Sequence, residues 1–398
     1  MTANPVVGLG LIGAGGFATF LAGATASLPT VAVRAVADSR PAAARDLARA
    51  HGARSVESWR DLLAEDDVDA VVVATPPAGH AEIARAALEA GKHVFCEKPL
   101  ALDDADARDL VATVERTGRV LVVDHVLRYN PLLHALTRLP SALLPPVQRF
   151  CFENDASDED LDPGHWFWDE AVSGGIFVEH GVHFFDAATM LLGRAATSVQ
   201  ATAARRAGSG LVDLVSATAR HGDDVLATHT HSFAHAHRCE RQLMRLDYGA
   251  AEARIEGWIP VAGVVDLWTD DAGADFCERL PSRCPDLLAV EGFRTKPAAQ
   301  VTVDVRSDAG TRSARGRGRD LTVPHHFRIG LTLGGAAAKA EVYAESVRAA
   351  MADLVRAATT GTSPRSGVGE GAAATTVALA ATRAAALGQS VQISGDSS

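Results

Sequence analysis

A carboxylate, an imidazole and a second carboxylate follow one another at helical spacing in SGGIFVEHGVHFFD, residues 173–186. They are Glu179, His183 and Asp186, and positions i, i+4 and i+7 fall on one face of a helix. The positions between them are mostly apolar, and charged groups among apolar neighbours are costly unless they are paired or functional. A structural histidine and a proton-transfer site both fit this stretch by itself, so the rest of the chain has to decide.

A glycine-rich motif, GAGGFA at residues 13–18, stands between an apolar strand pattern and a helix pattern. In that context G-x-G-x-x-A is typical of a dinucleotide-binding turn, with the pyrophosphate at the helix N-terminus. Gly13 permits the tight turn, Gly15 lets the backbone approach the pyrophosphate, and Ala18 allows close packing of helix on strand. Gly16 and Phe17 complete the predicted cofactor loop.

The residue that ends the second predicted strand bears on the choice of cofactor. Asp38 follows that strand, and an acidic residue there accepts hydrogen bonds from the adenosine ribose hydroxyls. It would also repel the 2′-phosphate of NADP, which favours NAD. Ser39 and Arg40 come next, and an arginine there suits a 2′-phosphate, so NADP remains possible.

The elements around these motifs alternate between strand and helix up to about residue 125. Apolar strand patterns at 31–38, 68–77, 93–99 and 119–125 are separated by helix patterns at 41–52, 79–91 and 103–118. This alternation predicts an α/β Rossmann domain, a parallel sheet with helices on both faces, over residues 1–125.

The rhythm changes in the rest of the chain, residues 126–398. A helix is predicted over roughly 175–192, successive antiparallel strands over 211–271, and helices near 338–359 and 369–387. We therefore predict a second, α+β domain with a large, mostly antiparallel sheet. The acidic segment 153–164 looks like a loop, and the segment 271–325 has too little periodicity to assign.

Composition narrows the class of protein. The net charge of −11 argues against nucleic acid and acidic membrane surfaces as partners. The five cysteines form no C-x-x-C motif, which favours a reducing, cytoplasmic setting over a disulfide framework or a zinc site. Residues 1–33 are uncharged, but they lack the basic start of a signal peptide and are broken by glycines. We expect neither a targeting segment nor a membrane helix.

Three further motifs, in order along the chain, make the resemblance to a known family specific. They are ATPPAGH (74–80), GKHVFCEKPLA (91–101) and HVLRYNP (125–131), and SGGIFVEHGVHFFD follows them. With these motifs the chain resembles the glucose–fructose oxidoreductase / inositol dehydrogenase family (Gfo/Idh/MocA) over nearly its whole length. The resemblance implies the two-domain fold predicted above. It also implies hydride transfer between NAD(P) and a secondary alcohol or ketone of a sugar, sugar nucleotide or cyclitol.

The resemblance also suggests which residues are catalytic. The lysine of the Glu-Lys-Pro motif is Lys98, and the family's Asp-x-x-x-His pair falls on Glu179 and His183. This chain has Glu where the family usually has Asp. His183 is suited to be the base that takes the alcohol proton. Glu179 would orient its ring as the carboxylate of a triad does, and Lys98 would stabilise developing alkoxide.

The remaining site predictions are of two kinds. On the cofactor side, the candidates besides the glycine loop and residues 38–40 are Thr75, Pro76, His80, Glu97, Lys98 and Arg128. On the substrate side, they are Lys98, His125, Tyr129, Asn154, Trp166, Trp168 and His183. A purely structural role remains open for residues 128–130 and for the two tryptophans, and Asp186 could be a salt-bridge partner or support the site.

Four histidines at 229, 231, 235 and 237 alternate along one predicted strand and so share a face. Their spacing could suggest a metal site, but no acidic or cysteine partner is evident nearby in the sequence, so we predict no metal. We interpret the face as part of a subunit interface or of the substrate site. A large antiparallel sheet needs its second face covered, which predicts a homo-oligomer, a dimer or tetramer.

Two alternatives to a dehydrogenase use the same residues. In the first, tightly held NAD oxidises a sugar transiently, elimination follows, and a glycosidic bond breaks without net redox change. In the second, the protein senses nucleotide without catalysis, and Lys98 and His183 would not be needed together. Accumulation of NADH during turnover distinguishes the leading interpretation from the first alternative.

Overall fold

The computed structural model describes residues 6–139, 143–293, 299–305, 314–316, 319–334 and 336–393. The chain divides into two compact units. Unit 1 combines Met1–Tyr129 with Gly164–Asp186 and Ala344–Thr382, and unit 2 combines Asn130–Pro163 with Ala187–Tyr343 and Arg383–Ser398. The predicted division into 1–125 and 126–398 therefore differs from these units, because two later segments join the N-terminal one.

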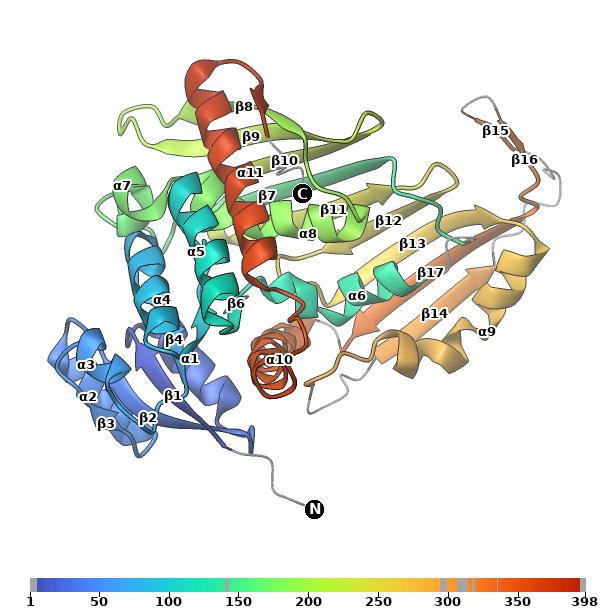
Figure 1. The fold of residues 1–398 in the computed structure, drawn as a ribbon. Coiled ribbons are helices and arrows are strands. Elements are labelled where there is room, and N and C mark those ends of the chain that lie inside the picture. The colour runs from blue at the N-terminus through green and yellow to red at the C-terminus, as the bar shows by residue number, and fades with distance from the viewer. Residues whose placement is uncertain are drawn as a thin grey trace. The chain divides into compact units, whose positions relative to one another are not determined.

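Unit 1 is built on a six-stranded sheet in which every pairing is parallel (Figure 1). Its order is β3-β2-β1-β4-β5-β6, so the strand order reverses between β1 and β4, where dinucleotides bind in such sheets. The strands are β1 (Val7–Ile12), β2 (Val31–Ala37), β3 (Arg54–Ser55), β4 (Ala70–Val73), β5 (His93–Cys96) and β6 (Leu121–Val123).

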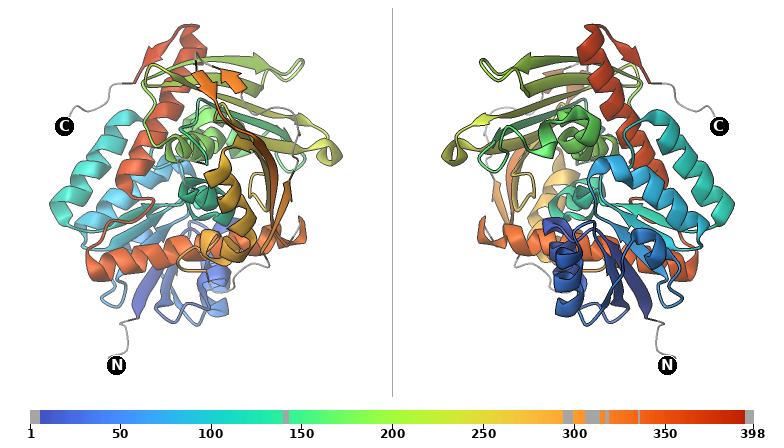
Figure 2. Two further views of the ribbon diagram at one scale, coloured as in Figure 1. Left: turned by 90° about the vertical axis from the view of Figure 1, so that its right-hand side faces the viewer. Right: turned by 90° about the vertical axis from the view of Figure 1, so that its left-hand side faces the viewer.

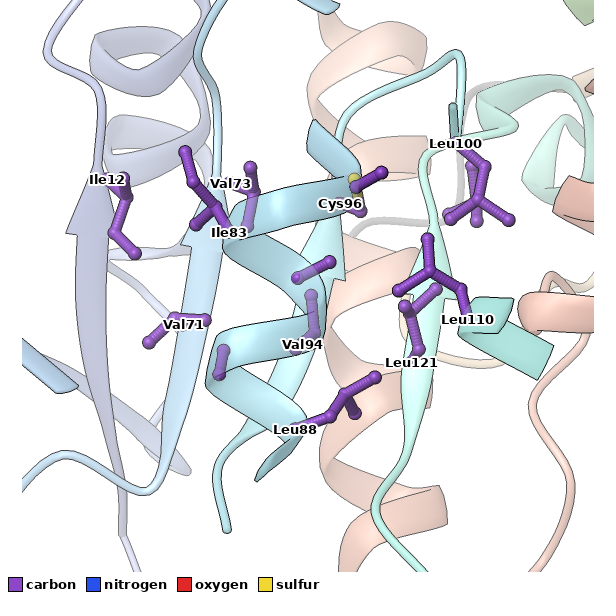
Figure 3. Packing of buried hydrophobic residues seen from close by; sticks show 14 of the residues in the cluster. Ile12, Val71, Val73, Ile83, Leu88, Val94, Cys96, Leu100, Leu110 and Leu121 are labelled. Atoms are coloured by element: carbon purple, nitrogen blue, oxygen red, sulfur yellow. The ribbon is translucent and has the colours of Figure 1, made fainter. Parts of the chain in front are cut away.

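The apolar runs of the sequence become the core of unit 1. Every residue of β1 and of β4 is buried, as expected for central strands covered on both faces. Figure 3 shows side chains of β4, β5 and β6 packed with residues of the helices α4 and α5. Among the labelled ones are Val71, Val94, Leu121, Leu88 and Leu110.

The helices of unit 1 begin and end at residues that the sequence marks. Asp103 caps α5 by accepting a hydrogen bond from the Asp106 N–H, and Gly118 ends that helix with a φ of 64°. The helices are α1 (Gly16–Thr25), α2 (Pro41–Ala50), α3 (Trp59–Leu63), α4 (His80–Glu89), α5 (Asp104–Thr117) and α7 (Glu170–Ser173), with most of α10 (Lys339–Thr360) and α11 (Val368–Leu387).

Unit 2 contains a ten-stranded mixed sheet in the order β14-β17-β13-β12-β11-β7-β10-β9-β8-β18. The pairing of β7 with β10 is parallel and the other pairings are antiparallel. The strands are β7 (Arg149–Ser157), β8 (Ser198–Arg205), β9 (Val212–His221), β10 (Val225–His235), β11 (Arg241–Asp247), β12 (Ala251–Glu256), β13 (Ala262–Thr269), β14 (Ala299–Val305), β17 (His325–Leu333) and β18 (Val391–Gln392).

One face of this sheet is buried and the other is partly open. Along β10, Ala227 is buried while its neighbour Leu226 is 44% exposed, as the period of two in a strand requires. The helices of this unit are α6 (Pro131–Arg138), the later part of α8 (Val182–Leu192) and α9 (Asp271–Leu287). The two side views show the strong twist of the sheet (Figure 2).

The predicted α/β fold with a second, mostly antiparallel domain is confirmed, with three local differences. The segment 153–164 starts as strand, because β7 continues to Ser157. The unassigned segment 271–325 contains α9, β14 and a small hairpin of β15 (Ala314–Gly316) and β16 (Arg319–Leu321), and parts of it lie outside the described residues. The helix predicted over 175–192 starts as a π-helical turn, η4 (Phe177–Gly181). Among the described residues, no helix is both long and apolar enough to span a bilayer.

Candidate active site

The glycine loop has the shape that a pyrophosphate site needs. Gly13 has a φ of +104°, and a Cβ there would lie 2.3 Å from the carbonyl oxygen of Ala74, so only glycine fits. A Cβ on Gly15 or Gly16 would meet no described atom within 4 Å. Within the described part of the chain no side chain caps the N-terminus of α1, so its first N–H groups remain available to an anion.

Asp38 is held at the end of β2 by its own loop. Its Oδ2 accepts a hydrogen bond of 2.6 Å from the Ala14 N–H, and its Oδ1 accepts one of 2.7 Å from the Arg40 N–H. The Arg40 guanidinium also pairs with Oδ1 at 3.2 Å and is largely exposed. Burial raises the pKa of Asp38, but these hydrogen bonds outweigh it and hold the pKa below its usual value. The carboxylate is therefore charged and beside the glycine loop.

His80 connects two loops at the carboxyl ends of the strands. Its Nε2 lies 2.8 Å from the Thr75 carbonyl oxygen and its Nδ1 lies 2.7 Å from that of Pro99. Both ring nitrogens are thus committed to backbone carbonyls, so the sequence-based expectation of a cofactor contact through this ring does not fit. By contrast, the buried Oγ1 of Thr75 has no hydrogen-bond partner among the described residues, which leaves it available to a ligand.

Lys98 follows β5, and its ammonium group is fixed by Glu179. Nζ donates to Glu179 Oε1 at 2.6 Å and to the Glu179 carbonyl oxygen at 2.9 Å, and both side chains are mostly buried. Burial lowers the pKa of Lys98, but the negative charges of Glu179 and Glu97 outweigh it and leave the pKa above its usual value. Lys98 is therefore an ammonium ion, able to stabilise a developing negative charge.

The π-helical turn explains why Glu179 faces Lys98. Gly174 and Gly175, with φ of +79° and +83°, lead the chain into the turn, and a Cβ on Gly174 would lie 2.6 Å from Val178. Hydrogen bonds in a π-turn close over five residues instead of four, so the α-helical spacing of Glu179 and His183 does not hold across it. The prediction that Glu179 orients the His183 ring is wrong, since its carboxylate bonds Lys98 and His183 Nδ1 has no partner among the described residues.

His183 is held as a neutral imidazole. It is 9% exposed and lies edge-on to His125, with 6.2 Å between the ring centroids. Burial lowers the pKa of His183 well below its usual value, and the positive charge of Lys98 lowers it further. His125 is 1% exposed, and within the described chain neither of its ring nitrogens has a hydrogen-bond partner. Two neutral imidazoles with free nitrogens therefore lie beside an ammonium group.

Two candidates from the 125–131 motif are structural. Arg128 forms a salt bridge with Asp186, with Nε 2.8 Å from Oδ2 and Nη2 2.7 Å from Oδ1, and donates from Nη1 to the Arg365 carbonyl oxygen. Tyr129 is 1% exposed and donates its hydroxyl to Asp353 Oδ2 at 2.9 Å. Burial raises the pKa of Tyr129 well above 10, which rules out a role as base. Asp186 is thus a salt-bridge partner.

The other substrate-side candidates lie in different surroundings. Trp166 is 38% exposed in unit 1, whereas Trp168 packs edge-on against Phe167 with 4.9 Å between centroids. Asn154 and Asn130 belong to unit 2, where each donates to a backbone carbonyl, that of Ser232 or of Pro260.

The histidine strand of unit 2 does not form the shared face that its spacing predicts. His229 and His231 are fully buried and stacked, and they pack against the rings of Phe150 and Phe152. An interface role is therefore wrong for these two. The pairing of β10 is irregular after Ser232. The other two histidines approach acidic groups, the half-buried His235 that of Asp155 and the exposed His237 that of Glu159. The described residues contain no cluster suited to a metal ion.

Sequence reasoning missed two buried polar groups near Lys98, Asp124 and His180. Asp124 follows β6 directly, and its carboxyl group interacts with that of Glu97, which follows β5. His180 lies in the π-turn, and burial lowers its pKa to about 3. The position of Asp124 at the carboxyl end of a parallel strand was the signal that could have identified it, because ligands of such sheets bind at that edge.

Comparison with known proteins agrees with this geometry. Residues 7–125 match the model of an oxidoreductase family with an NAD-binding Rossmann fold, and residues 148–248 match the C-terminal domain of the GFO/IDH/MocA proteins. The chain belongs to the Gfo/Idh/MocA family. The loop at Gly13–Ala18 and the charged Asp38 accordingly belong to an NAD-binding domain.

Individual relatives match this member of the Gfo/Idh/MocA family over part of their length. Inositol 2-dehydrogenase of Rhizobium meliloti is 35% identical over 199 residues, which cover 50% of this chain and 58% of the relative. Levoglucosan dehydrogenase of Pseudarthrobacter phenanthrenivorans is 31% identical over 171 residues, which cover 42% of this chain and 44% of the relative. Each match thus spans about half of the relative.

Solved structures match the whole chain in fold. A levoglucosan dehydrogenase in complex with NADH and levoglucosan aligns with a TM-score of 0.75 at 20% identity, covering 98% of this chain and all of that one. GenD2 from gentamicin A biosynthesis, in complex with NAD, aligns with a TM-score of 0.71 at 21% identity over 98% and 97% of the two chains. At such identities these likenesses establish the fold only.

Proposed function

We propose that the protein is an NAD-dependent dehydrogenase that moves hydride between the nicotinamide and a secondary alcohol or ketone of a sugar, sugar nucleotide or cyclitol. The observation that carries the proposal is an ammonium group, Lys98, which Glu179 holds at the end of β5, near the neutral, buried ring of His183 on α8. The substrates named for its relatives, inositol and levoglucosan, support a polyhydroxylated substrate.

The residues present fit NAD. The open space at Gly15 and Gly16, the uncapped start of α1, the Asp38 carboxylate and the unpartnered Thr75 hydroxyl suit a pyrophosphate, a ribose and further polar groups of the cofactor. When bound, the nicotinamide supplies the hydride acceptor or donor. Proton transfer and stabilisation of the developing charge are carried out by side chains of the protein.

The chemistry follows from the protonation states. In the oxidative direction the alcohol loses its O–H proton to a ring nitrogen of His183 while its C–H hydrogen leaves as hydride, and a ketone results. The neutral imidazole is the form that can accept this proton. Lys98 donates a hydrogen bond to the reacting oxygen and stabilises the negative charge that develops there, which is larger in the transition state than in the substrate.

Glu179 has a different role from the one the sequence indicated. It fixes the ammonium of Lys98 through its side chain and its backbone carbonyl, and its negative charge keeps Lys98 protonated. It acts through Lys98 and is a positioning residue. His125, with both ring nitrogens free of partners in the described structure, is the remaining candidate to bind a substrate hydroxyl.

The test is NADH formation with a panel of cyclitols, sugars and sugar nucleotides. We expect absorbance of NADH to rise with at least one polyol, and Lys98→Met to abolish the rise. Lys92→Met is the matched control, since Lys92 precedes β5 at its other end and, among the residues that the structure describes, donates to the backbone carbonyls of Glu65 and Val68. Cleavage of a glycoside without net NADH would support the lyase alternative, and NAD binding without turnover of any kind would support the sensor.

A further inference from the structure

Two carboxyl groups meet at the carboxyl ends of β5 and β6. The Glu97 N–H donates to the Val73 carbonyl oxygen at 2.9 Å, and the Asp124 N–H donates to that of Cys96 at 2.9 Å. These backbone bonds and the register of β5 on β6, in which Cys96 lies opposite Val123, place the two residues side by side at adjacent strand ends, where their carboxyl groups interact. Asp124 is 2% exposed, and its Oδ1 has no hydrogen-bond partner among the described residues.

A hydrogen bond between two carboxyl groups requires a proton, because ionised carboxylates can only accept. Glu97 also accepts from the Lys98 N–H at 3.0 Å through its Oε2, so one of its oxygens already has a donor. Two bare negative charges in contact in a buried place would be strongly unfavourable. The arrangement is therefore stable with one shared proton.

We propose that Glu97 and Asp124 share one proton, and that the single negative charge they keep sets the preference of the site for oxidised over reduced nicotinamide. The proposal rests on the proposed function and adds two positioning residues to it. Nicotinamide chemistry in sheets of this order takes place outside the carboxyl ends of the strands, and both residues stand directly at those ends.

The other charged groups around Glu97 and Asp124 cancel one another, so the net charge of this part of the site is the charge of these two carboxyl groups. Lys98 and Glu179 form an ion pair and cancel each other, and Arg128 and Asp186 do the same. The titratable groups that face these two carboxyls or Lys98 are Glu179, Cys96, Tyr129 and four histidines, His80, His125, His180 and His183. Burial lowers the pKa of the four imidazoles and raises that of the thiol and the phenol, so all six of these groups are neutral. One unit of negative charge then remains.

The Glu97–Asp124 pair changes its charge near neutral pH. Burial raises the pKa of Asp124 to about 7 and raises that of Glu97 well above its usual value. Below this range both carboxyls are protonated and the charge is lost, whereas above it one proton remains and the charge is −1. Because oxidised nicotinamide is a cation and the reduced ring is neutral, only NAD⁺ responds directly to this change.

The experiment measures the dissociation constants of NAD⁺ and NADH from pH 5.5 to 8.5 by calorimetry. For the wild type we expect NAD⁺ affinity relative to NADH to rise roughly tenfold with pH, the order expected when one partly buried negative charge is added to a site that binds a cationic ligand. Asp124→Asn and Glu97→Gln each keep one carboxylate and a hydrogen-bonding amide. In Asp124→Asn the remaining Glu97 no longer faces a like charge, so the NAD⁺/NADH affinity ratio should be constant near its high-pH value. Glu97→Gln leaves Asp124 buried and should follow the pH dependence of the wild type, whereas the double variant should give a constant ratio near the low-pH value.

A wild-type ratio independent of pH, or an Asp124→Asn ratio that follows the wild type, would overturn the proposal. The infrared carbonyl band of a protonated carboxyl gives a second readout that needs neither cofactor nor substrate. At pH 7.5 the wild type should show one such band that is missing in whichever of Asp124→Asn and Glu97→Gln folds. If the band is present and no cofactor binds, the shared proton stands and the dehydrogenase proposal fails; if the band is absent, the shared proton is refuted whatever the protein catalyses.

Discussion

The Lys98–Glu179 ion pair should be the strongest single coupling in the candidate site, and a double-mutant cycle can measure it. With 2.6 Å between Nζ and Oε1, Coulomb attraction at an effective dielectric of 20 is about 6 kcal/mol before desolvation is subtracted. Both side chains are mostly buried, at 15% and 13% exposure, so solvent screens this attraction little. Removal of either partner leaves the other charge buried.

We therefore expect Lys98→Met and Glu179→Gln each to lower the free energy of unfolding by about 3–5 kcal/mol. Glu179→Gln belongs at the lower end, because Lys98 keeps its bond to the Glu179 carbonyl oxygen and the charge of Glu97. The double variant buries no unpaired charge. Its loss in free energy of unfolding should therefore be smaller than the sum of the two single losses by at least about 3 kcal/mol. Urea unfolding of the four proteins at one pH gives all the terms.

Additive losses, within about 0.5 kcal/mol, would refute this account of Lys98 and Glu179. The conservative variant Glu179→Asp provides a further check. On the sequence-based interpretation, in which Glu179 only orients His183, it would be nearly neutral. With Glu179 bonded to Lys98, the shorter side chain loses one methylene of reach, so we expect both stability and turnover to fall.

Three further predictions concern the cofactor, the catalytic pair and assembly. NAD should bind more tightly than NADP in parallel titrations, because Asp38 is ionised beside the glycine loop; tighter NADP binding would mean that the exposed Arg40 dominates. His183→Ala and Lys98→Met should each lower turnover by about 10²–10⁴-fold; His183→Ala removes no charge and should leave NAD affinity nearly unchanged, and its retention of more than half the wild-type rate would exclude His183 as the base. Light scattering at micromolar concentration should show a homo-oligomer that Leu226→Arg dissociates, since Leu226 is 44% exposed on the open face of the large sheet, and a wild-type monomer would contradict this.

The Rossmann half of the fold could be predicted because its signals are local. The strands β1, β2, β4, β5 and β6 all lie in apolar runs, and the turn at Gly13 follows from a backbone that only glycine can adopt there. The large sheet was predicted as a set of strands. The parallel pairing of β7 with β10 joins segments about 75 residues apart, and the alternation of apolar and polar residues along one strand does not reveal its pairing partner.

The site was predicted as a set of residues and only partly as a set of contacts. Spacing along a helix assumes one period, and the π-turn at Phe177–Gly181 changes the phase between Glu179 and His183. The partner of Glu179 is Lys98, 81 positions away in the sequence. Likewise, the two backbone carbonyls that engage His80 come from separate loops. Such partners are chosen by tertiary packing, and residue type alone does not reveal them.

Asp124 shows why a buried acid escapes sequence reasoning and yet has a measurable consequence. An aspartate after a strand looks like a turn residue, and only the fold shows that it is 2% exposed and beside Glu97. Its pKa is raised by burial to about 7, so the stability it contributes is present at low pH and is lost as pH rises from its unfolded value near 4. In Asp124→Asn this loss is absent. Between pH 5 and 7, the free energy of unfolding of Asp124→Asn, measured in urea, should therefore rise relative to that of the wild type by about 1.4 kcal/mol or more per pH unit. A constant difference between the two proteins across that range would show that Asp124 is ionised in the folded state.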